Sequence, residues 1–209
     1  MKNTRWWLIR HAPVPNPGKV IYGRSDPPAD IGDSDTLVAL AARLPPQAVW
    51  VTSHLRRTRQ TAAALRLPGS DMALVERALA EQDFGRWEGL SHDDVADWHP
   101  KEARRFWSDP ATEAPPDGES FAAVMERVAG AVARLTDLYA GRDIVAVIHG
   151  GSIRAALALA LDLTPQAALR LAVAPLSLSR IDHYGGDEGG GSWSVAALNA
   201  LGTFSGHGR

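Results

Sequence analysis

Short apolar runs alternate along the chain with segments in which apolar residues recur every three or four positions. The runs predict six strands, at residues 5–10, 48–53, 73–76, 143–148, 177–183 and 193–198. Runs of this length without polar alternation are typical of strands covered on both faces of a parallel sheet. The glycine-rich segment 185–192 predicts a hairpin between the last two.

Helical spacing of apolar residues predicts helices over 34–44, 56–66, 119–139 and 150–162. The longest opens at Glu119 and Ser120, and its core-facing residues are expected to be Phe121, Val124, Met125, Val128, Val132 and Leu135. Because strands and helices alternate, we predict a three-layer α/β/α sandwich with a mostly parallel central sheet.

Residues 91–118 depart from this alternation. They carry Trp98, Phe106 and Trp107 among prolines and acidic residues, which predicts an irregular helical insertion that acts as a lid. The rest of the chain shows no internal repeat, and its 209 residues are enough for one core. We therefore predict a single domain over 1–209 with a lid-like insertion at 91–118.

Composition narrows the classes of function. A formal net charge of −2 gives no overall positive field for nucleic acid or an anionic membrane surface. The absence of cysteine excludes thiol catalysis, disulfides and cysteine-ligated zinc. The N-terminal residues lack a signal-peptide pattern, and Arg154 interrupts the most apolar helical segment. We expect a cytoplasmic protein with no nucleic-acid or membrane partner.

Ionisable residues gather where the predicted strands end, and ligands of parallel sheets bind beyond those ends. The first strand ends at Arg10 and His11, and the strand at 143–148 is followed by His149 and two glycines that open a helix. Such a helix start can hold an anion on its free N–H groups. The helix after Ser53 begins with several arginines. Each feature alone is common, but together they predict a cationic pocket on one rim.

Four segments carry a resemblance to a known family. They are LeuIleArgHisAla (8–12), SerHisLeuArgArgThrArgGlnThrAla (53–62), LeuAlaGluGlnAspPheGlyArgTrpGluGly (79–89) and ValIleHisGlyGlySerIleArg (147–154). In order and separation they resemble the signature blocks of the histidine phosphatase superfamily, which has the phosphoglycerate-mutase-like fold. The resemblance extends from about residue 5 to residue 199.

The resemblance implies a site and a reaction. His11 would be the nucleophile that becomes phosphorylated, and Glu81 the general acid. The phosphoryl oxygens would be bound by Arg10, Arg57, His149 and the Gly150 N–H. Arg57, rather than its neighbour Arg56, matches the family's arginine because of its separation from GlnThrAla at 60–62. The substrate would be a small phosphorylated metabolite, with no metal and no cofactor.

Physical chemistry agrees with these roles. Phosphoryl transfer spreads negative charge over three oxygens, which arginines stabilise well. The same positive charges disfavour protonation of His11 and keep a lone pair available for attack. A carboxyl group beside an anionic phosphate is biased towards its protonated form, as a proton donor requires, so Glu81 suits the acid role.

The segment IleTyrGlyArgSerAspProPro (21–28) resembles the TyrGly-x-x-Asp segment of the α-ribazole phosphatase branch. This implies that Tyr22 and the backbone at Gly23 approach the substrate. Asp26 either contacts the substrate or closes a turn.

The chain also departs from the family pattern. Ala12 replaces the usual glycine after the histidine but keeps the N–H for phosphate binding. Pro13 and Val14 replace a polar pair, so Asn16 is predicted as a substitute substrate contact. His54 replaces a common proline.

Other interpretations stay open from the residues alone. His11, His149 and Glu81 match a two-histidine, one-carboxylate metal site, although Arg10 and Arg57 would repel a divalent cation. A phosphoglycerate-type mutase and a non-catalytic module that binds a phospho-ligand are further alternatives. The short acidic and aromatic insertion favours a phosphatase over a mutase. Trp87, Trp98 and Trp107 suit either the core or a substrate pocket. The sequence leaves a homodimer open.

Overall fold

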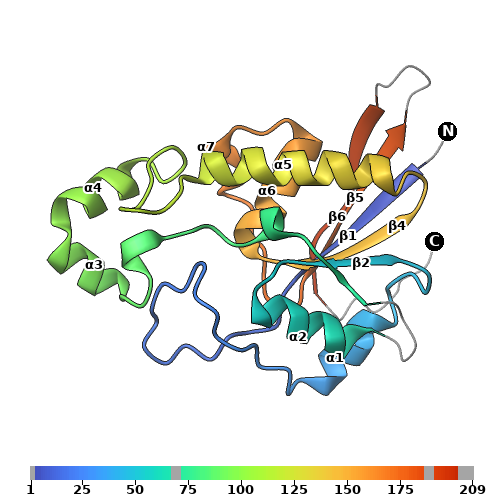
Figure 1. Cartoon of the computed structure of the whole chain (residues 1–209), viewed down its shortest axis with the longest axis horizontal. Coiled ribbons are helices and arrows are strands. Elements are labelled where there is room, and N and C mark those ends of the chain that lie inside the picture. The colour runs from blue at the N-terminus through green and yellow to red at the C-terminus, as the bar shows by residue number, and fades with distance from the viewer. Residues whose placement is uncertain (1–2, 67–71, 186–190, 202–209) are drawn as a thin grey trace.

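The computed structural model describes residues 3–66, 72–185 and 191–201, in which a six-stranded sheet lies between two layers of helices (Figure 1). The sheet order is β3-β2-β4-β1-β5-β6. Its strands are β1 (Asn3–Arg10), β2 (Val49–Thr52), β3 (Leu74–Val75), β4 (Asp143–Ile148), β5 (Leu178–Gly185) and β6 (Gly191–Ala200).

The predicted strands and the mostly parallel sheet are confirmed. The β3, β2, β4 and β1 strands pair in parallel, whereas β5 runs antiparallel to both β1 and β6. The antiparallel pairing of β5 with β6 agrees with the predicted hairpin. Its connecting residues 186–190, like 202–209, lie outside the described residues.

Helices cover both faces of the sheet, which confirms the three-layer prediction (Figure 1). One face carries α5 (Phe121–Leu138) and α6 (Gly150–Leu161), and the other carries α1 (Ser34–Ala41) and α2 (Arg56–Leu65). Side chains of a strand point alternately to its two faces. Accordingly Ile144, Ala146 and Ile148 of β4 join one core, whereas Val145 and Val147 join the other.

Local signals explain where the helices begin. The Ser120 side chain accepts a hydrogen bond from the Ala123 N–H and caps α5, one residue inside the predicted start. The predicted apolar face of α5 is buried, with Met125 only partly covered. The short helix α7 (Pro165–Ala168) follows α6 and was not predicted, because four residues are too few to show a helical repeat.

The predicted insertion is more regular than expected. It contains α3 (His92–Trp98) and α4 (Pro100–Ser108), at the left of Figure 1. A capping box formed by Ser91 and Asp94 starts α3, and Pro100 stands in the first turn of α4. We call 91–118 the α3–α4 lobe. Val95, Ala103 and Phe106 of this lobe form a small core together with Ile21 and Trp87, which lie outside it in the sequence.

The three tryptophans of this region have different environments. Trp87 is completely buried in the lobe's core, whereas Trp98 is 64 % exposed and Trp107 is 47 % exposed. Only Trp107 is therefore both accessible and next to the core of the lobe, where its ring contacts Phe106.

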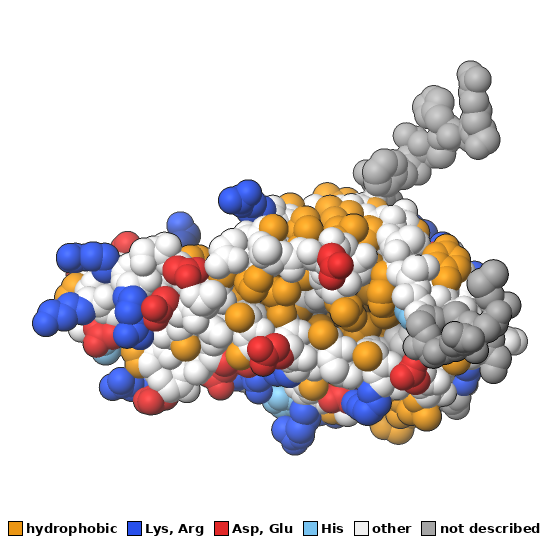
Figure 2. Space-filling view, turned by 90° about the horizontal axis from the view of Figure 1, so that it is seen from above, with side chains coloured by type: hydrophobic (Ala, Val, Ile, Leu, Met, Phe, Trp, Pro, Cys, Tyr) orange, Lys and Arg blue, Asp and Glu red, His pale blue; other side chains and the backbone are white. Residues whose placement is uncertain are grey.

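The surface agrees with the near-neutral composition. Figure 2 shows acidic and basic side chains interspersed on the end of the molecule that carries α3 and α4, and apolar side chains gathered over its middle. This face has no continuous basic area of the kind that binds nucleic acid. Within the described ranges, no helix has the length and apolar character needed to cross a membrane.

Candidate active site

Three neighbouring strands, β2, β4 and β1, deliver the predicted residues to one edge of the sheet. Because Arg10 pairs with Ile148 in the register of β1 and β4, His11 and His149 leave their strands side by side. Their ring centroids lie 5.2 Å apart at an interplanar angle of 64°. Both are almost completely buried, so these imidazoles form the floor of a site and not a surface patch.

The His11 ring has a defined tautomer. Its Nδ1 atom lies 2.7 Å from the Ala12 carbonyl oxygen, which can only accept a hydrogen bond. Nδ1 therefore carries the proton and Nε2 keeps its lone pair. Burial, with further contributions from Arg57 and Arg10, lowers the pKa of His11 to about 3. The predicted effect of the arginines is present, but burial is the larger cause.

His149 is held by Ser53, the residue that follows β2. Its Nε2 atom lies 2.7 Å from the Ser53 hydroxyl oxygen, and that oxygen accepts a hydrogen bond from the Leu55 N–H. The Nδ1 atom is buried and has no hydrogen-bond partner among the described residues. Burial first, and Arg57 second, hold the pKa of His149 well below its usual range.

Arg57 connects α2 to the loop that contains Gly23. It is fully buried, and its two terminal nitrogens donate to the carbonyl oxygens of Gly23 at 2.6 Å and Ser25 at 2.7 Å. Its Nε is buried without a partner in the described part of the chain. The Tyr22 ring centroid lies 5.1 Å from the guanidinium carbon, a cation–π contact. Burial lowers the pKa of Arg57.

The loop itself requires a glycine at one position. A Cβ at Gly23 would collide with the Gln82 carbonyl oxygen and the Glu88 carboxylate. Asp26 accepts a hydrogen bond from the Arg56 N–H at the start of α2, so it ties the loop to that helix.

Arg10 and the start of α6 form the opposite wall. Nη1 of Arg10 donates to the Val173 carbonyl oxygen at 2.6 Å, and its buried Nε has no partner in the described segments. The Arg10 guanidinium carbon lies 3.6 Å from the position that a Cβ of Gly150 would take. Gly150 is the first residue of α6, so its N–H has no carbonyl of that helix to bond.

Glu81 reaches the same helix start from the segment after η1, a 3₁₀ helix over Arg77–Leu79. Its Oε1 atom accepts from the Gly151 N–H at 3.0 Å and from the Gln82 N–H at 3.1 Å. A Cβ at Gly151 would collide with Oε1, so the second glycine allows the carboxylate to approach the helix.

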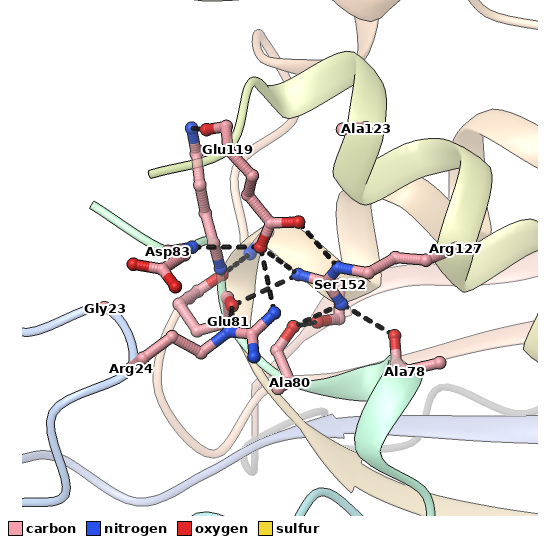
Figure 3. Close-up of polar contacts among 12 residues, drawn as sticks. Gly23, Arg24, Ala78, Ala80, Glu81, Asp83, Glu119, Ala123, Arg127 and Ser152 are labelled. Carbon is pink, nitrogen blue, oxygen red and sulfur yellow. Dashed lines mark hydrogen bonds and ion pairs between the residues drawn. The ribbon is translucent and has the colours of Figure 1, made fainter. Parts of the chain in front are cut away.

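A network of charged side chains, which the sequence did not reveal, supports the backbone of Glu81. Arg127 donates to the carbonyl oxygens of Ala78 at 2.6 Å, Ala80 at 2.9 Å and Glu81 at 3.1 Å. Arg24 donates from Nε to the Glu81 carbonyl oxygen at 2.8 Å. Figure 3 shows these guanidinium groups converging on the segment from Ala78 to Glu81.

Glu119 joins the two arginines. Its Oε1 lies 2.7 Å from Nη2 of Arg127 and 3.1 Å from Nη2 of Arg24, and it also accepts from the Asp83 N–H (Figure 3). Burial is the largest single influence and raises the pKa of Glu119, but the bonds and charge of Arg127, the Asp83 N–H and the charge of Arg24 together outweigh it, so the net shift is downward. The sequence marked Glu119 only as a helix start, since nothing in its spacing indicates these partners.

A cleft of about 290 Å³ opens from this site towards the α3–α4 lobe. It is lined by Tyr22, Gly23, Glu81, Phe84, Phe106, Trp107, Arg154 and neighbouring residues. Arg154 lies within a matching segment, but no role was predicted for it. A larger hollow of about 440 Å³ beside α1 and α2 is lined mainly by apolar residues and lies away from the two histidines.

Two groups that were predicted to contact the substrate form hydrogen bonds within the protein instead. Both polar atoms of the Asn16 side-chain amide bond the backbone of Val20, at 2.8 and 3.0 Å, and Asn16 does not line the cleft. The geometry therefore gives no support to a substrate contact by Asn16. The Ala12 N–H, expected to be available for phosphate, donates to the Thr61 hydroxyl at 2.9 Å.

A metal site is the alternative interpretation of the two histidines and Glu81. Among residues 3–66, 72–185 and 191–201, no three or more His, Cys, Asp or Glu side chains are arranged to hold a metal ion. His11, His149 and Glu81 thus lie in one site without converging as ligands.

Comparison with known proteins extends these findings. A family model described as histidine phosphatase superfamily (branch 1) matches residues 6–199. Three curated mycobacterial relatives are 36% identical over 156 residues, and the match covers 74% of this chain but only 41% of their length. A glucosyl-3-phosphoglycerate phosphatase from Mycolicibacterium vanbaalenii is 34% identical over 175 residues, which cover 78% of this chain and 76% of that protein.

Solved structures agree with the fold. The mycobacterial glucosyl-3-phosphoglycerate phosphatase in complex with VO3 has a TM-score of 0.79 at 29% identity, covering 94% of this chain and 98% of that one. A putative α-ribazole-5'-P phosphatase from Escherichia coli has a TM-score of 0.81 over 96% of this chain and 99% of that one. Its 23% identity makes it evidence for the fold alone.

Proposed function

Because the chain belongs to branch 1 of the histidine phosphatase superfamily, we propose that it hydrolyses a small phosphate monoester through a covalent phosphate on His11. The observation that carries this proposal is the tautomer of His11. Its Nδ1 proton is bound by the Ala12 carbonyl, and its pKa of about 3 keeps Nε2 unprotonated at neutral pH. An oriented imidazole with a free lone pair is what a nucleophile needs.

In the first step Nε2 of His11 attacks phosphorus as the bond to the leaving oxygen breaks. Arg10, Arg57 and Nδ1 of His149, assisted by the Gly150 N–H, would bind the three remaining oxygens. Buried donors that are already oriented stabilise developing charge strongly, because no solvent has to reorganise around them. The Nε–H groups of both arginines have no partner among the described residues and are available for this purpose, and Nδ1 of His149 would add a third donor in the tautomer whose Nε2 accepts from the Ser53 hydroxyl. Such a clamp supplies its charge without a metal ion.

Glu81 would protonate the leaving oxygen as the bond to phosphorus breaks. It would then take a proton from the water that attacks phosphohistidine, releasing phosphate and free His11. Glu81 suits this role because it lines the cleft and lies beside the helix start that faces the phosphoryl group. Tyr22 and Gly23, which line the same cleft, would contact the rest of the substrate.

The position of the basic residues favours a phosphatase over a mutase. A mutase that handles a second phosphate needs several cations facing the cleft, whereas among the described residues Arg154 is the one lysine or arginine that lines it. Lys101, Arg104 and Arg105 of α4 are exposed and none of them lines it. Arg105 also forms an ion pair with Glu113. The single-domain organisation proposed for this chain would then use the α3–α4 lobe as one wall of the leaving-group cleft and as its lid.

Two substrates are suggested by similar proteins. One is a glucosyl-3-phosphoglycerate, from the relatives that share 34% and 29% identity. The other is α-ribazole phosphate, suggested by the TyrGly segment at residues 22 and 23. Both are phosphate monoesters of a sugar or a sugar acid, so both are compatible with the proposed chemistry.

An assay with 4-nitrophenyl phosphate and a panel of phosphate monoesters, in excess chelator, tests the proposal. Wild type should be active, and His11→Ala should be inactive. His183→Ala serves as the matched control, because His183 lies on β5 and contacts Trp193 outside the site. Inactivity of wild type on the whole panel would refute the phosphatase, and abolition of activity by chelator would refute the metal-free mechanism.

Glu81→Gln tests whether Glu81 is the general acid. The substitution should slow the hydrolysis of esters with poor leaving groups by roughly 10²–10⁴-fold, and that of aryl esters with good leaving groups far less. Glu126→Gln, an exposed change on α5, controls for the loss of a carboxylate. Equal slowing of all esters would remove Glu81 from the acid role.

A further inference from the structure

Among the described residues Arg154 is the one arginine that lines the cleft, whereas Arg10 and Arg57 of the phosphate site do not line it. Arg154 stands four residues after Gly150 on α6, so it projects from the same helix face one turn further along. Its Nη1 atom lies 3.8 Å from the position of a Gly150 Cβ, and the Arg10 guanidinium carbon lies 3.6 Å from that point. Two guanidinium groups therefore flank Gly150.

Among the described residues, the Arg154 guanidinium has a hydrogen-bond partner only at its Nε atom. Its Nε donates to the Leu171 carbonyl oxygen at 2.8 Å, which fixes the plane of the guanidinium. In the described part of the chain, no carboxylate lies within ion-pair distance of it. By contrast, Arg24 and Arg127 share Glu119, and Arg180 is paired with Asp182.

A partly buried cation without a paired anion is costly unless a ligand supplies one. The Arg154 guanidinium is partly buried, and this burial lowers its pKa. Glu81 is the one acidic residue of the described chain that lines the cleft with Arg154, but its Oε1 is bonded to the N–H groups of Gly151 and Gln82. When Glu81 carries the proton that the reaction requires, Arg154 has no negative neighbour in the cleft.

The remaining walls of the cleft indicate which chemical group of a ligand would pair with Arg154. Tyr22, Phe84, Phe106 and Trp107 present apolar and aromatic surface, His92 and Gln82 add polar side chains, and no lysine lines the cleft among the described residues. One guanidinium whose two terminal nitrogens have no hydrogen-bond partner among the described residues matches a carboxylate, which it binds with two parallel hydrogen bonds. A second phosphate would require more positive charge than one arginine provides.

We propose that Arg154 binds a carboxylate on the leaving group, so that the preferred substrates are phosphate monoesters of hydroxy acids. This inference rests on the proposed function, since it assigns the cleft beyond Glu81 to the leaving group. It separates the two suggested substrates: a phosphoglycerate derivative carries such a carboxylate, and α-ribazole phosphate does not.

The test compares 3-phosphoglycerate with glycerol 3-phosphate, which has a hydroxymethyl group in place of the carboxylate. Wild type should show a kcat/KM about 10–100-fold higher for 3-phosphoglycerate, the range expected for a charge-assisted pair. Arg154→Gln should lose that preference, with 3-phosphoglycerate falling by a similar factor and glycerol 3-phosphate changing less than about threefold. Arg104→Gln, an exposed change on α4, should leave both values unchanged.

Each outcome of this comparison either supports or overturns the proposed role of Arg154. Equal losses on both esters in Arg154→Gln would place the arginine on the transferred phosphoryl group and overturn the proposal. Absence of a preference in wild type would overturn it without any variant, so a folding defect in Arg154→Gln cannot obscure the answer. Activity on 4-nitrophenyl phosphate without a carboxylate preference would refute this inference alone. Inactivity on these three esters and on the whole panel of phosphate monoesters would refute the proposed function as well.

Discussion

The Oε1 atom of Glu81 lies 3.0 Å from the backbone nitrogen of Gly151, whose N–H donates to it across 70 residues of sequence. This bond joins the proposed acid to the helix start that faces the phosphoryl group. It is possible only because residue 151 has no side chain, since a Cβ there would collide with the carboxylate.

Gly151→Ala should therefore reduce activity in the same way as a partial loss of the function of Glu81. The added methyl group is compatible with helical backbone but displaces the carboxylate, so turnover of esters with poor leaving groups should fall by at least about tenfold. Steady-state rates over a leaving-group series would measure this.

Gly130→Ala on α5 is the matched control, because nothing lies within 4 Å of its added Cβ. It should keep full activity and gain about 0.5–1 kcal/mol in stability. Full activity of Gly151→Ala would contradict the assignment.

Glu119→Gln should weaken the support of the Glu81 backbone without touching the site. Glu119 and Arg127 are less than a fifth exposed, so the change should cost about 1–3 kcal/mol of unfolding free energy. If the network positions Glu81, the variant should also become more sensitive to leaving-group basicity. Glu113→Gln removes the more exposed pair with Arg105 and should cost no more than about 1 kcal/mol. A uniform loss across all esters would indicate a purely structural role.

The buried histidines predict how stability depends on pH. The folded protein keeps His11 neutral down to about pH 3, whereas the unfolded chain takes up a proton near pH 6.5. Between those values unfolding takes up a proton, so the free energy of unfolding falls as the pH falls, by about 1.4 kcal/mol per pH unit from His11.

Chemical denaturation at pH 7.5 and at pH 5.0 checks this. Wild type should lose about 2 kcal/mol more than His11→Asn between the two conditions, because the asparagine does not titrate. Carboxylates contribute equally to both proteins and cancel in the difference. The same loss in both would mean that His11 is already protonated in the folded state at pH 5.0.

The parts of this structure that could be predicted are those that depend on local patterns in the sequence. The central strands follow from uninterrupted apolar runs, and residues that leave parallel strands, such as His11 and His149, necessarily meet at one edge. The α3–α4 lobe was only partly predicted, because prolines and acidic residues there obscured two regular helices with clear start signals at Ser91 and Pro100.

What could not be predicted depends on contacts between distant segments. Arg127 lies on the core helix α5 and supports Glu81 from 46 positions away, and no spacing rule links the two. Asn16 was predicted as a substrate contact from its place after the first strand, but its amide closes the local turn with Val20. Short polar side chains commonly bond their own backbone in this way, and a linear pattern does not show which choice the loop makes.

Rapid-quench trapping of the phosphorylated chain is the most direct test of the central claim, that His11 carries the phosphoryl group. During the first turnover of an aryl phosphate, wild type should gain the mass of one phosphoryl group in an acid-labile, alkali-stable bond, and peptide mapping should locate it on His11. His11→Ala should gain none, and His183→Ala should label like wild type. Release of product without any label, or a label on another residue, would contradict the account.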